Sequence, residues 1–128
     1  MVFTTFFKIM KQESSNRLTF DQLELLNRYI QQHLGNSALT IDHLARVVDM
    51  SEFHFARLFK ATTGTSPHQY IMGCRIQLVK TLLRSSNLLL GEIAYQAGFA
   101  DHSHMGREFK RVTGLTPSEW RKRKNFWE

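Results

Sequence analysis

Two pairs of cationic residues stand at equivalent places in a pattern that occurs twice in this sequence of 128 residues. Arg57 and Lys60 are three residues apart, and so are Arg107 and Lys110. On a helix, a spacing of three residues puts both side chains on one face. An arginine there can donate two hydrogen bonds to the O6 and N7 atoms of guanine, whereas a lysine suits a phosphate. The pattern therefore indicates contact with a nucleic acid.

The pattern belongs to a longer internal repeat. Between positions 54 and 70, seven residues recur fifty positions later: His, Arg, Phe, Lys, Thr, Gly and Pro. Upstream, the apolar positions 41, 44, 45 and 48 match 90, 93, 94 and 97, at an offset of 49. One residue is therefore inserted in the second copy, between Phe99 and His104. Two copies are too few for a solenoid, and they indicate a duplicated functional unit.

Each copy is predicted to form a helix-turn-helix. The first apolar positions have the spacing of a short amphipathic helix, which Thr40 can cap. After a turn, Ser51 can cap a second helix that ends at Gly64. Gly98 in the second turn suggests a positive φ, and Asp49 takes that place in the first turn. We place the two helix-turn-helix units at about 41–62 and 90–112.

Three further helices frame these units. Capping signatures open them at 19–22, 66–69 and 116–119. The middle helix, about 66–84, has apolar residues nearly all round, so we expect it to be covered on more than one side. Its roughly 18 residues make a rod of about 27 Å, against ~34 Å between successive major-groove faces of B-DNA. No segment indicates a strand, so the sequence predicts an all-α fold of two helix-turn-helix subdomains joined by a long central helix.

The framed domain is expected to span 19–125, after an N-terminal lead or linker at 1–18. The lead contains Phe3, Phe6 and Phe7. Three interpretations of these residues stay open: a remnant of a partner domain, a small packed arm, or a disordered end.

Burial of the apolar side of each second helix leaves one face for contacts with DNA. At the N-terminal ends of these faces, which usually meet base edges, Phe53 can contact a thymine methyl group. Cations further along each helix suit phosphates. His54 stands at the same place in the first copy as His104 in the second, and we expect it to have a structural or phosphate-contacting role. The candidate base-contacting residues are Phe53, Ala56, Arg57, His102, Ser103, His104 and Arg107. The candidate phosphate-contacting residues are His54, Lys60, Lys110, Arg111 and Arg121.

These motifs resemble those of a known family. Residues 50–60 and 64–70 look like the first half of the AraC/XylS-type DNA-binding domain, and 93–99, 103–110 and 114–121 look like its second half. The resemblance covers about 20–123. It implies seven helices, with both recognition helices entering adjacent segments of the major groove. Met105 and Trp120 stand where the family more often has an aromatic residue and a tyrosine, which are variations of the core.

Composition narrows the class of protein. The formal net charge is +6, with +1 on residues 1–74 and +5 on 75–128, which suits a polyanionic partner. The single cysteine, Cys74, excludes an internal disulfide and indicates a reducing compartment. Apolar stretches fall far short of the ~20 residues that cross a bilayer, and 1–10 lacks the features of a signal peptide. We therefore expect no membrane association.

Catalysis and metal binding are not expected either. The sequence contains no arrangement typical of a nucleophilic enzyme and no glycine loop for phosphates. His102 and His104 diverge on a helix, and no further ligand pattern completes a metal site. We expect neither an enzyme, a metal nor a cofactor.

The leading hypothesis is a sequence-specific DNA-binding transcription regulator, by family habit an activator. Its expected partners are double-stranded DNA and RNA polymerase, and its expected location is the cytoplasmic nucleoid. The chain is either a complete small regulator or part of a longer one with an N-terminal sensor domain. The alternative is a helical protein-interaction module that contacts RNA polymerase or another regulator and binds DNA weakly.

Overall fold

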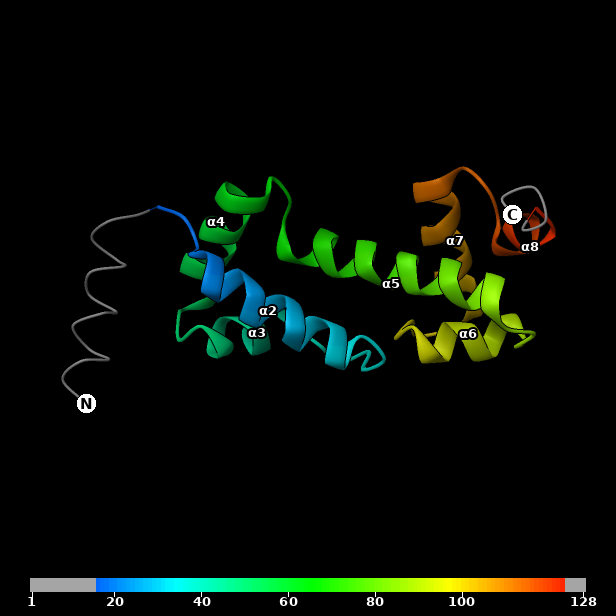
Figure 1. Cartoon of the computed structure of the whole chain (residues 1–128), viewed down its shortest axis with the longest axis horizontal. Coiled ribbons are helices and arrows are strands. Elements are labelled where there is room, and N and C mark those ends of the chain that lie inside the picture. Colours follow the sequence, from blue (N-terminus) through cyan, green and yellow to red (C-terminus); the bar gives the residue numbers. More distant parts are fainter. Residues whose placement is uncertain (1–15, 124–128) are drawn as a thin grey trace. The chain divides into compact units, whose positions relative to one another are not determined.

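The computed structural model of the chain describes residues 16–123, which form seven α-helices and no strand (Figure 1). This confirms the all-α fold. Most of the predicted lead, including its three phenylalanines, and the end of the domain at residue 125 lie outside the described residues. The helices, labelled as in Figure 1, are α2 Phe20–His33, α3 Ile41–Val47, α4 Glu52–Thr63, α5 Pro67–Ser85, α6 Leu90–Gln96, α7 His102–Thr113 and α8 Pro117–Lys122.

The described residues divide into two compact units, each with one helix-turn-helix. The first comprises 16–30 and 40–70 and contains α3 and α4, and the second comprises 31–39 and 71–123 and contains α6 and α7. Helices α2 and α5 contribute residues to both units.

Local signals start and stop these helices as the sequence predicts. The hydroxyl groups of Thr40 and Ser51 accept hydrogen bonds from backbone N–H groups at the beginning of α3 and α4. The capping pairs at 19–22, 66–69 and 116–119 are all formed. Gly64 ends α4 with φ 83° and Gly114 ends α7 with φ 82°, in the left-handed region that glycine tolerates.

Aromatic pairs repeat in the cores of the two units. In the first, the ring of Phe59 packs edge-on against Tyr70, with centroids 5.4 Å apart. In the second, Phe109 packs in the same way against Trp120 at 5.7 Å. Apolar side chains from the neighbouring helices surround each pair, and each fully buried one contributes roughly 1.5–3 kcal/mol. In the first unit these are Leu26, Ile30, Leu44, Phe55 and Leu58, and in the second Ile76, Val79, Leu83, Ile93 and Met105.

The turns of the two units differ by one residue. Asp49 and Gly98 both have positive φ, 57° and 86°, as the repeat suggested. The backbone N–H of Met50 donates to Ala45, and that of Phe99 donates to Ala94, still at an offset of 49. Helices α4 and α7 then begin fifty residues apart. The inserted residue is therefore Ala100, which precedes α7.

A buried arginine lies beside the second turn and bonds the segment that follows α2. Arg75 of α5 donates hydrogen bonds to the carbonyl groups of Leu34 and Asn36, at 3.3 and 2.9 Å. Its burial lowers the pKa of the guanidinium. A Cβ atom on Gly98 would stand 2.0 Å from the Leu34 carbonyl oxygen and 2.9 Å from Nε of Arg75. Glycine is therefore required at this turn by space as well as by φ.

Candidate nucleic-acid interface

Helix α4 divides into a buried side and an exposed side. Phe55, Leu58 and Phe59 are buried, which turns Phe53 and Arg57 toward solvent. The Phe53 side chain is 78% exposed, an unusual state for so large an apolar group. Removal of the Phe53 ring from water by a partner would lower the free energy of the complex, so this face is suited to a contact.

Phe53 and Arg57 are neighbours on that face. The guanidinium carbon of Arg57 lies 5.8 Å from the centroid of the Phe53 ring, a cation–π distance. This contact restrains an arginine that would otherwise be mobile in water. The two predicted base-contacting residues are thus held together as one apolar and cationic group.

A shallow hollow of about 410 Å³ runs along the same face. Half-buried Ala56 adds little bulk to it, and Lys60 lines it beyond Arg57. The hollow has cations beside an apolar surface, which matches phosphates beside base edges and methyl groups. It brings together Phe53, Ala56, Arg57 and Lys60 on one side of α4, and their contacts with DNA remain predictions.

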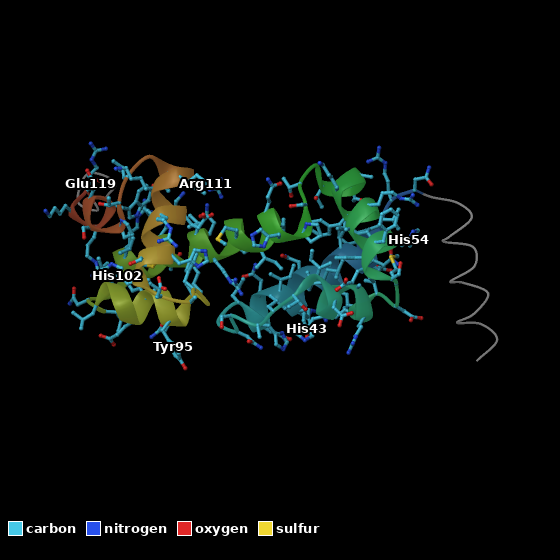
Figure 2. All side chains as sticks on the ribbon, turned by 180° about the vertical axis from the view of Figure 1, so that it is seen from behind. His43, His54, Tyr95, His102, Arg111 and Glu119 are labelled. Atoms are coloured by element: carbon cyan, nitrogen blue, oxygen red, sulfur yellow. The ribbon has the colours of Figure 1, made fainter. Side chains whose placement is uncertain are left out.

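Helix α7 presents a more polar face. Asp101 caps its beginning by accepting a hydrogen bond of 2.7 Å from the backbone N–H of His104. Met105 and Phe109 are buried, so His102, Ser103 and Arg107 are left exposed. Figure 2 shows His102 at the beginning of α7 and Arg111 near its end. The polar groups of His102, Ser103 and Arg107 can form hydrogen bonds with base edges.

His104 is less open than this face suggests, whereas Gly106 has free space beside it. The imidazole of His104 packs edge-on against Phe99, with ring centroids 5.3 Å apart, and the residue is half-buried. A Cβ atom added to Gly106 would meet open space within the protein. No part of the described chain therefore requires glycine at this position.

Four of the five candidate phosphate-contacting residues fall into three environments. Lys60 and Lys110 are exposed near the ends of α4 and α7, whereas His54 is half-buried in the first turn of α4. Arg111 is exposed but its guanidinium pairs with Glu108 at 2.9 Å. That ion pair neutralises part of the charge that a phosphate would meet.

Arg121 has a structural role that sequence reasoning missed. Its guanidinium donates three hydrogen bonds, to the carbonyl groups of Leu83, Ser86 and Leu88 at 3.3, 3.3 and 2.7 Å. These carbonyl groups lie at the end of α5 and in the segment that follows it. Arg121 therefore ties α8 to the beginning of the second helix-turn-helix, and its contact with phosphate remains a prediction.

Trp120 is the second link between α8 and α5. The cationic groups of Lys80 and Arg84 lie 5.1 and 5.5 Å from the centroid of its ring. Together with the bonds of Arg121, this stacking fixes α8 beside α5. The sequence indicated only that Trp120 belongs to the core.

Among residues 16–123, no three potential metal ligands lie close enough to hold an ion. No helix among them has the length and apolar content for crossing a bilayer.

Comparisons with known proteins agree with this geometry. A family described as a helix-turn-helix domain matches residues 44–123. The MmsAB operon regulatory protein of Pseudomonas aeruginosa is 34% identical over 101 residues, which cover 79% of this chain and 33% of that protein. The HTH-type transcriptional activator RhaR of Salmonella dublin is 36% identical, over 66% of this chain and 30% of RhaR. A putative AraC-like transcription regulator of Streptomyces lividans is 37% identical, over 65% of this chain and 27% of that protein.

A solved structure shares the fold and carries DNA. The DNA-binding domain of AdpA, a global transcriptional factor, was crystallised with a target DNA. It matches this chain with a TM-score of 0.76 and 25% identity, over 84% of this chain and 95% of that one. The chain belongs to the AraC/XylS family.

Membership of the AraC/XylS family confirms the resemblance of the two helix-turn-helix motifs. The family consists of transcription regulators with a DNA-binding domain and not of enzymes, in agreement with the sequence. The chain spans about a third of the length of the curated relatives that it matches.

Proposed function

We propose that this chain is a sequence-specific DNA-binding domain that regulates transcription, with α4 and α7 each inserted into the major groove. One observation carries the proposal. In both units, the helix that follows the turn buries its apolar side and leaves an arginine and a lysine, Arg57 and Lys60 or Arg107 and Lys110, exposed at the same positions. A helix in the major groove reads bases with such a face.

The proposed roles differ between the two helices. In α4, Arg57 pairs with a guanine while the exposed ring of Phe53 covers a thymine methyl group, and Ala56 leaves room for the base edge. In α7, Arg107 pairs with a guanine, and His102, Ser103 and His104 exchange hydrogen bonds with neighbouring bases. The first helix therefore relies on apolar and arginine contacts, and the second on polar ones.

Phosphate contacts supply the affinity that does not depend on sequence. We assign them first to Lys60 and Lys110, which are exposed. His54, Arg111 and Arg121 can add further phosphate contacts. Arg111 would do so by giving up its ion pair with Glu108. Arg121 would use the N–H groups that are not engaged in its three hydrogen bonds to carbonyl groups.

The wider role of the chain is proposed from its relatives. The RhaR relative is named a transcriptional activator, which supports activation and contact with RNA polymerase. The relatives are about three times as long as the matched segment, which supports a sensor domain as a partner of this domain. Because chromosomal DNA forms the nucleoid, we place the chain there, in the cytoplasm.

A salt series tests the proposal against the protein-interaction alternative. The affinity of the chain for duplex DNA is measured between 50 and 200 mM salt. With three to five phosphate contacts, affinity is expected to fall roughly 40-fold to 500-fold across this range, because each contact releases counterions. Weak binding with a flat salt dependence would favour the protein-interaction module instead.

A further inference from the structure

The first unit carries an open apolar groove that no part of the proposed DNA contact uses. Its volume is about 370 Å³, and it lies between α2, the end of α4 and the start of α5. Phe20, Leu23, Phe59 and Tyr70 line it, and Phe20 is 76% exposed. Exposure of so large a ring beside an apolar groove indicates that a partner covers both.

We propose that residues 3–10 of the same chain occupy this groove. Four apolar residues of that segment, Phe3, Phe6, Phe7 and Met10, have the spacing i, i+3, i+4, i+7. That spacing is the anchor pattern by which one apolar face fits into a hydrophobic groove. Among the three interpretations of the lead, the proposal selects the packed arm.

The point at which the lead joins the described residues favours this occupant. The guanidinium of Arg17 donates to the Ala61 carbonyl, and the backbone N–H of Leu18 donates to Oγ1 of Thr62 at 2.9 Å. Thr63, the next residue of α4, lines the groove. Residues 17 and 18 are therefore held at the edge of the groove.

The tether between the apolar residues of segment 3–10 and the edge of the groove is long enough for the segment to reach the groove. Six residues, 11–16, separate Met10 from Arg17. An extended chain spans at most ~3.3–3.6 Å per residue, so the tether reaches about 20 Å. A short tether of this kind keeps the segment at an effective concentration of the order of millimolar beside the groove.

Charge distinguishes the groove from the second hollow of this unit. The charged residue lining the groove is acidic Glu24, whereas Arg57 and Lys60 line the hollow on the DNA-facing side of α4. The segment and its tether carry Lys8 and Lys11 against a single acid, Glu13. Glu24 already pairs with Arg28 at 3.6 Å, so charge acts mainly by repelling the positive segment from the hollow.

Docking would stabilise the helix that is proposed to read DNA. The segment would cover the ring of Phe20 and contact Thr63 at the end of α4. It would leave Phe53 and Arg57 uncovered, since positions 59 and 63 lie on a different face of α4 from 53 and 57.

Hydrogen exchange in the full chain gives the direct test. Backbone amides of residues 3–10 are expected to exchange several-fold more slowly than those of a synthetic peptide of residues 1–15. Phe20→Ser, a change at an exposed side chain, is expected to return them to the peptide rate. The matched control is Leu25→Ser on the same helix, 45% exposed and outside the groove, which should leave the protection unchanged.

A change in the lead itself supplies the reciprocal test. Phe6→Ser with Phe7→Ser alters none of residues 16–123, so the two described units are expected to keep their fold. Its amides in α2 are expected to exchange several-fold faster than those of the unaltered chain. Exchange of residues 3–10 at the peptide rate in the unaltered chain would overturn the proposal. So would protection that grows with protein concentration, since the occupant would then come from a second copy.

Discussion

Arg57 and Arg107 occupy the same position in two helices but have different neighbours. Arg57 lies over the exposed ring of Phe53, a contact worth ~0.5–1 kcal/mol at such sites. Arg107 follows the exposed polar residues His102 and Ser103. The stacked arginine loses less conformational entropy when it binds, whereas the polar neighbours of Arg107 offer more hydrogen bonds. The two helices are thus suited to different base sequences around the guanine that each arginine is proposed to contact.

Substitution of Lys110 distinguishes contacts that position a helix on the DNA backbone from contacts that read bases. Lys110→Ala is expected to weaken binding to a specific site and to random DNA by a similar factor, and to reduce the salt slope by about 1, because one phosphate contact is lost. Binding titrations at several salt concentrations measure both effects. Lys110→Arg keeps the charge and should keep the slope. A loss of sequence discrimination in Lys110→Ala would contradict the assignment to phosphate.

At the scale of the helices, the turn before α7 depends on close contact. Gly98→Ala is expected to destabilise the chain by at least about 2 kcal/mol. The left-handed region alone costs alanine ~1–2 kcal/mol, and its Cβ would meet the Leu34 carbonyl at 2.0 Å. Unfolding in urea, followed by circular dichroism, measures the change.

Gly106→Ala is the matched comparison. Its Cβ meets open space in mid-helix, so the substitution is expected to stabilise the chain by up to ~1 kcal/mol. Equal stability of the two variants would show that the turn is not constrained as described. If Gly106→Ala folds more stably yet binds DNA less well, the glycine serves the approach of α7 to the groove.

The limits of the helices could be predicted from sequence because their signals act over a few residues. Ser51 and Thr116 cap helices through a backbone group three positions away. Arg121 and Arg75 could not be assigned in this way, because they bond carbonyl groups 33 to 41 positions distant. A cation at position 75, between the apolar residues of α5, was the only available signal for Arg75.

The exposed faces were predicted by elimination, once the apolar spacing had assigned the buried side. That reasoning identified Phe53 and Arg57 but not the stacking between them, which depends on rotamers. It also grouped His104 with the open residues, although its ring packs against Phe99. Spacing assigns a residue to a face, whereas its partners depend on packing.

At the scale of the whole molecule, the repeat implies two reading surfaces in one chain. Each unit has its own core, its own turn and its own exposed arginine. A chain with two such units can recognise an asymmetric DNA site without forming a dimer, because the units are unequal copies. The site should then contain two separate stretches of conserved sequence.

Selection of binding sites from random duplex DNA tests this account most directly. The unaltered chain, Arg57→Ala and Arg107→Ala are compared. Each variant is expected to lose sequence preference in a different stretch, at a cost of ~1–3 kcal/mol on the selected site and much less on random DNA. Equal losses on selected and random DNA, or loss of the same stretch in both variants, would contradict the claim that α4 and α7 each read bases.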